Sequence, residues 1–165
     1  PGMYTGMMTN PVSQADNSGW LELPPAPGLT DDELVSGRFI HLFPNVSISV
    51  LPNHLFVMIL TPQGPGHTSE QTYILTHPST MGTDGAADAM AKLADFWDHV
   101  NAEDIEIVER VQTGISTTAY AGGRMCYRFE EPLHRFQNMV IDRMVGIDRV
   151  PGGDHDEGIS VFGTR

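Results

Sequence analysis

The chain has 165 residues, enough for one domain with a sizeable core. Its 21 acidic and 9 basic residues give a formal net charge of −12, and no cluster of Lys and Arg offsets it, so no nucleic-acid partner is expected. The one cysteine, Cys126, permits no disulfide within the chain and favours a cytoplasmic location. No apolar run approaches the roughly 20 residues of a membrane-spanning helix, so no membrane association is expected.

The first 37 residues predict an extended lead-in segment. They are rich in Gly, Pro, Asn and Ser, and the run of prolines at residues 24–28 excludes a helix interior or a central strand. Residues 30–33, Thr-Asp-Asp-Glu, have the form of a capping box. They predict a short helix that continues to about Ser36.

Four strands are predicted next, at residues 39–43, 46–50, 54–61 and 68–76. Residues 46–50 alternate apolar and small polar side chains, as in a half-buried strand. The turns at residues 51–54 and 63–66 contain Pro, Asn and Gly. Short turns between consecutive strands predict an antiparallel meander.

Helices dominate the second half. Residues 86–113 predict one long helix with Gly114 as its stop, and a second helix runs from Pro132 to about Val145, ended by Gly146. Residues 125–129 predict a short strand between them. The main unit is therefore residues 38–150, of the α+β class with a sheet packed on one side by helices, and residues 151–165 form a polar tail.

Asp104 is the anomalous residue of the long helix. At about 100° per residue it falls in the middle of the apolar stripe rather than on the polar side. The stripe contains Leu93, Trp97, Val100, Ile107, Val108 and Val111. A buried charge there requires a partner, a proton or a metal ion. Pairing with Arg, with the indole N–H of Trp or with backbone donors is the alternative to metal binding.

The other acidic residues of this helix lie on its polar side. Asp95, His99 and Glu103 follow an i, i+4, i+8 spacing that a metal site could use. Because other charges surround them, a solvated face is the favoured interpretation.

Three segments resemble the α subunits of Rieske-type ring-hydroxylating oxygenases. In that family, a long helix carries an acidic pair followed by Glu, Val-Gln and Gly. A second sequence block follows this helix, and a central strand with a hairpin precedes it. The matching segments here are FWDHVNAEDIEIVERVQTG at residues 96–114, YAGGR at 120–124 with FEEPLHRF at 129–136, and LFPNV at 42–46. The resemblance covers roughly residues 38–146 and looks closest to the branch that includes quaternary-amine demethylases.

The resemblance implies a helix-grip (START/Bet v 1-like) fold around a mononuclear Fe(II) held by two His and one carboxylate. The family's carboxylate matches Asp104. Substrate is then expected against Trp97, Val100 and Val108, although all three are equally suited to packing in the core.

Much of the family's machinery has no counterpart in this sequence. There is no His-x4-His pair, and one cysteine cannot supply the two Cys of a Rieske [2Fe-2S] cluster. We therefore expect a C-terminal fragment of the catalytic domain that is inactive alone. The resemblance implies as partners an N-terminal Rieske portion, a separate reductase or ferredoxin that passes on NADH electrons, O2, and an aromatic or quaternary-amine substrate. It also implies a homotrimer.

Two other classes of function remain open at this stage. One is a non-catalytic helix-grip domain that binds apolar small molecules, in which Asp104 is a polar anchor without a metal. The other is an assembly subunit completed by a chain that brings the histidine pair.

Overall fold

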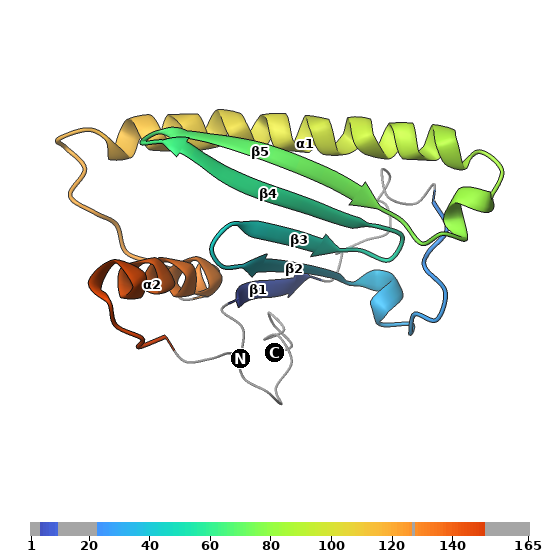
Figure 1. Ribbon diagram of the computed structural model, residues 1–165, viewed down its shortest axis with the longest axis horizontal. Helices are drawn as coiled ribbons and strands as arrows, with labels where there is room; N and C mark the ends of the chain where they lie inside the picture. Colours follow the sequence, from blue (N-terminus) through green and yellow to red (C-terminus); the bar gives the residue numbers. More distant parts are fainter. Residues whose placement is uncertain (1–3, 10–22, 127, 151–165) are drawn as a thin grey trace.

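A five-stranded antiparallel sheet and two helices make up the computed structural model, which describes residues 4–9, 23–126 and 128–150 (Figure 1). The strands are neighbours in chain order, so the predicted meander is confirmed. They are β1 (Tyr4–Thr9), β2 (Gly37–Leu42), β3 (Val46–Val50), β4 (Leu55–Gly64) and β5 (His67–Leu75). The helices α1 (Ala86–Ile115) and α2 (Glu131–Val145) follow, which confirms the α+β class.

The turns that join the strands follow from local sequence. The peptide N–H of Leu51 donates to the carbonyl of His54 at 3.0 Å and closes the β3–β4 turn. Gly66, at φ +85°, supplies the left-handed conformation needed between β4 and β5. In the predicted capping box, the Glu33 carboxylate accepts from the backbone N–H of Thr30 at 2.9 Å, just before the 3-10 helix Glu33–Val35.

Strand β1 was not predicted, because its Gly, Met and Thr residues carry no alternating pattern. It pairs with β2 over six residues and forms the edge of the sheet. Gly6 allows this close approach, since a Cβ at that position would lie 2.5 Å from the carbonyl oxygen of Phe39. The pairing is therefore a tertiary effect, supplied by β2.

Two local predictions were wrong. The strand predicted at residues 125–129 is absent from the described residues of that range, which are Met125, Cys126, Arg128 and Phe129. Instead, the Glu130 carboxylate accepts the backbone N–H of Cys126 at 2.6 Å just before α2 begins. Gly114 does not stop α1, which continues to Ile115 and is closed by the Ser116 hydroxyl donating to the carbonyl of Gln112. The peptide N–H of Ser116 also donates to the carbonyl of Gln112, so the last turn closes beyond Gly114. The predicted tail at residues 151–165 lies outside the described residues.

Both helices pack on one face of the sheet. Trp97 of α1 stacks on Phe56 of β4, with ring centroids 4.1 Å apart and planes 9° apart. Phe136 of α2 meets the His41 ring of β2 edge-on at 4.9 Å. Cross-strand register places Phe56 opposite Ser49, and Ser49 opposite Phe39, two residues from His41 on the same face. Figure 1 shows α1 along the β4–β5 hairpin and α2 near β1, at opposite edges of the sheet.

A buried chain of hydrogen bonds holds α1 to the sheet. The Trp97 indole N–H donates to Nε2 of His54 at 2.9 Å, so Nδ1 carries the histidine proton and donates to the Asn53 side-chain oxygen at 2.7 Å. The Asn53 amide in turn donates to the carbonyl of Leu23 at 3.2 Å. Because burial disfavours the charged imidazolium, the pKa of His54 falls to about 4. The chain joins the lead-in segment, the β3–β4 turn and α1.

Candidate functional site

The two halves of α1 have different surroundings. Leu93 is 1% exposed and forms the main core cluster with Leu23 and Ala89. Residues 102–115 are exposed throughout, although their apolar members continue the stripe that is buried in the first half. The tip of the β4–β5 hairpin, residues 61–73, is exposed as well. The described residues therefore leave half of an amphipathic helix uncovered.

Asp104 lies in this uncovered half. Its helical position is within about 20° of both Leu93 and Trp97, but its side chain is exposed. The expectation that it is buried was wrong, because the covering chain that the stripe calls for is not among the described residues. Nor does Asp104 have a hydrogen bond or ion pair within them; the Trp97 indole, one suggested partner, is bound to His54. Its role as a ligand stays a prediction.

The three residues expected to line a substrate pocket are placed differently from one another. Trp97 is half-buried, with its ring on Phe56 and its N–H on His54. Val100 is half-buried, and Val108 is 65% exposed. Trp97 thus has a packing role in the described structure, and all three share the stripe of Asp104.

A cavity of about 250 Å³ lies on the sheet face beside α2. Sequence reasoning missed it, although the alternation of Ser47 and Ser49 with apolar residues in β3 indicated a face lined by small hydroxyl side chains. This volume is below the roughly 300 Å³ at which ligand pockets typically start. The side chains that line it include Thr5, Met7, Phe39, His41, Ser47 and Ser49, with Pro132 of α2 alongside.

Three polar side chains in this cavity are neighbours across β1, β2 and β3. Thr5 is in register with His41, and His41 with Ser47. The two nitrogens of the His41 ring lie 2.8 Å from the Ser47 hydroxyl and 3.2 Å from the carbonyl of Pro44. The Thr5 hydroxyl donates to the carbonyl of Pro132 at 3.0 Å, which ties the sheet to α2.

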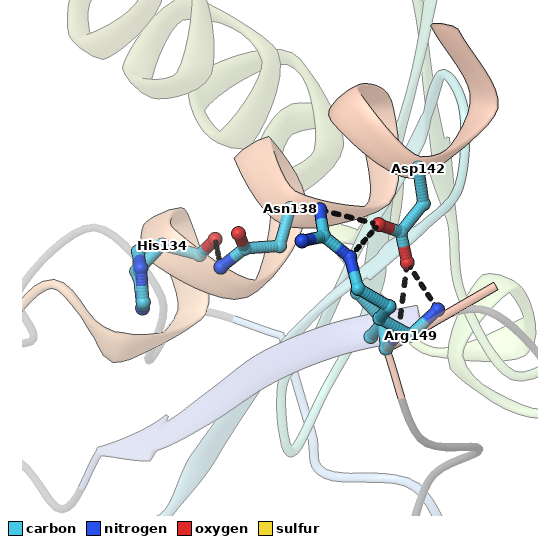
Figure 2. A network of polar contacts seen from close by, with 5 residues as sticks. His134, Asn138, Asp142 and Arg149 are labelled. Carbon is cyan, nitrogen blue, oxygen red and sulfur yellow. Dashed lines mark hydrogen bonds and ion pairs between the residues drawn. The ribbon is translucent and has the colours of Figure 1, made fainter. Parts of the chain in front are cut away.

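A second polar group, at the end of α2, was not predicted. Asp142 is 2% exposed and accepts from the backbone N–H groups of Arg149 and Val150 at 2.6 and 2.9 Å, and from the Arg149 guanidinium (Figure 2). Burial by itself raises the pKa of this carboxyl, but these donors outweigh it and hold the pKa below its ordinary value. Since every donor comes from the segment after α2, Asp142 anchors that segment.

The described residues contain no group of three His, Cys, Asp or Glu side chains able to hold a metal ion. His99 pairs with Glu103 at 3.6 Å on the exposed face of α1, as expected for a solvated surface. Cys126 is exposed and has a free thiol. Within the same residues, no helix combines the length and the hydrophobicity of a membrane span.

An antiparallel meander with a long helix across one face is the architecture of helix-grip catalytic domains. Residues 2–146 match the family described as "Ring hydroxylating alpha subunit (catalytic domain)". The chain belongs to this family, whose members are oxygenases and thus oxidoreductases, as the sequence resemblance had indicated.

Two curated relatives are the glycine betaine monooxygenase oxygenase subunits of Pseudomonas aeruginosa strains UCBPP-PA14 and PAO1. Each is 27% identical to this chain over 117 residues, covering 71% of this chain and 27% of the relative. The chain therefore spans about a quarter of the length of the curated relatives it matches.

Proposed function

We propose that this chain supplies the C-terminal part of the catalytic domain of a Rieske-type oxygenase that hydroxylates a small aromatic or quaternary-amine substrate. One observation carries the proposal: Asp104 continues the sheet-facing stripe of α1, yet its carboxylate is exposed and without a partner among the described residues. A carboxylate ligand that awaits its remaining partners has these properties. The relatives' name, glycine betaine monooxygenase, supports a quaternary amine.

On this proposal Asp104 is the carboxylate ligand of a mononuclear Fe(II), whose chemistry when bound is the activation of O2. The described residues supply one ligand and do not by themselves form the site. The histidine pair and the [2Fe-2S] Rieske cluster come from other parts of the oxygenase, with NADH electrons passed on by a separate reductase or ferredoxin. The assembled protein is a homotrimer in the cytoplasm, and this chain alone is inactive.

The residues of this chain act by positioning and by excluding water. The Trp97 stack and its hydrogen bond to His54 set the rotation of α1, and so the face on which Asp104 lies. Val100 and Val108 flank Asp104 by about one turn on either side and would keep water from the carboxylate once covered. Trp97, Val100 and Val108 share the stripe of Asp104, and the substrate would lie against them.

A chimera tests the proposal. The matching segment of the Pseudomonas aeruginosa subunit is replaced by residues of this chain, and iron content and oxygenation are measured. We expect the chimera to bind mononuclear iron. Asp104→Ala should remove that iron and abolish turnover, while the visible absorbance of the Rieske cluster persists because that cluster has its own ligands.

Glu103→Ala is the matched control, because Glu103 is the adjacent acid on the exposed face of the same helix. It should keep both iron and turnover. If Asp104→Ala keeps its iron in a folded chimera, the assignment fails and a non-catalytic binding domain becomes the better interpretation.

A further inference from the structure

The sheet has a second apolar face, opposite the one that carries the two helices. Phe56, whose ring packs on α1, precedes Val57 in β4, so the Val57 side chain points away from the helices. Cross-strand register continues from Val57 into a row of apolar side chains from β2 to β5. The row consists of Ile40, Ile48, Val57 and Tyr73. We call the surface around this row the outer sheet face.

The described residues leave the outer sheet face uncovered. Val57 is half-buried although β4 is an inner strand, whereas the adjacent Phe56, under α1, is 7% exposed. Towards the β5 side of the face, Tyr73 is 43% and Leu75 51% exposed. An antiparallel sheet that faces water normally carries polar residues on that side. A contiguous apolar face therefore indicates a surface that another chain or segment covers.

The outer sheet face is almost without charge, although the chain has a net charge of −12. Its one Asp, Glu, Lys or Arg side chain is Arg38, opposite Val50 near one end, and Arg38 pairs with Glu33 at 3.5 Å. The second half of α1 is also exposed and apolar, but acids interrupt it. These acids are Glu103, Asp104, Glu106 and Glu109. Two copies of that helix surface would oppose like charges, whereas two outer sheet faces would not.

We propose that the outer sheet face is a self-association surface, on which a second copy of this chain packs across a two-fold axis. A two-fold contact brings the same patch of both copies together, so it requires a patch that is complementary to itself. A neutral apolar sheet face meets this requirement, because two such faces pack with interdigitated side chains about 10 Å apart. The inference goes beyond the proposed function and does not depend on it.

The size of the face sets the expected affinity. Five strands about 4.8 Å apart, each with three same-face residues about 7 Å apart, give an area of about 500 Å². Two copies together would bury about 1,000 Å², the lower limit of a specific interface. We therefore expect a reversible dimer with a dissociation constant in the micromolar range, rather than an obligate one.

Sedimentation equilibrium of the full chain, over concentrations that bracket the micromolar range, measures the association. We expect a monomer–dimer equilibrium that tightens severalfold as NaCl is raised from about 0.05 M to about 0.5 M, because salt screens the repulsion between two copies of charge −12. Weakening by salt would indicate an interface held by ion pairs and would contradict the inference.

Three variants with the same change of charge locate the interface. Ile48→Lys, at the centre of the row, should raise the dissociation constant at least about tenfold, because it buries an ammonium group without a partner. Val108→Lys on α1 and Met144→Lys on α2 are the matched controls. Their side chains are 65% and 80% exposed, and both variants should dimerise as the wild-type chain does.

Circular dichroism and the melting temperature report whether each variant is folded. If Ile48→Lys unfolds, Tyr73→Lys makes the same test, since Tyr73 lies in the same row and is more exposed. A chain that stays monomeric, a trimer, or a dimer that a folded variant in the row leaves intact would each overturn the inference. A dimer weakened by the controls instead would do the same. None of these measurements involves iron, so the role of Asp104 is tested separately.

Discussion

Asp104 and Asp142 are both helical aspartates, and their carboxylates have opposite surroundings. Asp104 is exposed and has no partner among the described residues, whereas Asp142 is buried and accepts from two backbone N–H groups and a guanidinium. Sequence periodicity singled out the first and overlooked the second. The reason is that the donors to Asp142 come from a loop, whose path no helical pattern encodes.

This contrast gives a prediction for the melting temperature of the chain. Asp104→Ala should shift it by less than about 2 °C, because no donor is stranded. Asp142→Ala should lower it by several degrees, because the N–H groups of Arg149 and Val150 lose their acceptor. Differential scanning calorimetry of the two variants measures both effects. A large loss with Asp104→Ala would reveal a structural partner and argue against a ligand role.

His54 should make the free energy of unfolding depend on pH. Its pKa is about 4 in the folded chain and near 6.5 when unfolded. The unfolded chain therefore binds more protons between these values, and the stabilising contribution is complete above pH 6.5 and lost as the pH falls towards 4. At about 1.4 kcal/mol per pKa unit, the loss at pH 4.5 is about 2–3 kcal/mol.

Urea unfolding at pH 7.5 and pH 4.5 measures this loss. His54→Gln is the control, since glutamine can still accept from the Trp97 indole but does not titrate. Its free energy of unfolding should change less between the two pH values than that of the wild-type chain. If the free energy of unfolding changed equally for the variant and the wild-type chain, His54 would not be buried as a neutral ring.

At the level of elements, α1 was predicted from its start at Ala86, and β3 to the residue, because each carries a strong periodic pattern. Strand β1 was missed because its pairing depends on β2 rather than on its own residues. The cavity was missed for a related reason: it requires the register of β1, β2 and β3 together. Periodic patterns within one element and short turns between consecutive strands can be predicted from sequence, whereas pairing between segments distant in the chain cannot.

The two halves of α1 should differ in protection. We expect backbone amides of residues 102–115 to exchange hydrogen faster than those of the first half, because tertiary packing provides most of a helix's stability in water. Hydrogen exchange followed by mass spectrometry resolves the two. Leu93→Ala should cost about 2–5 kcal/mol, while Val108→Ala should stay within about 0.5 kcal/mol. Equal protection would show that the second half of α1 is covered in solution.

For the whole molecule, the number of metal-ligating side chains decides whether the isolated chain can bind Fe(II). A single carboxylate competes poorly with water and buffer for Fe(II), and the described residues gather no three ligands. We therefore expect the purified 165-residue chain to retain far less than one equivalent of iron after gel filtration. Metal analysis by mass spectrometry measures this. Stoichiometric iron would mean that ligands outside the described residues complete a site, and that the chain is more self-sufficient than proposed.

Because α1 is held to the sheet at Trp97, a small tilt of the helix there becomes a larger displacement in its second half. Asp104 lies seven residues further on, about 10 Å along the axis at 1.5 Å per residue. A tilt of about 10° at the Trp97 contact would displace its backbone by about 2 Å, ten times the tolerance of roughly 0.2 Å in metal–ligand distances. Rigidity at the pivot alone cannot give that accuracy. Whatever covers the distal half must act as a second support, so substitutions under that cover should loosen the geometry at Asp104 even when they touch neither the metal nor the substrate.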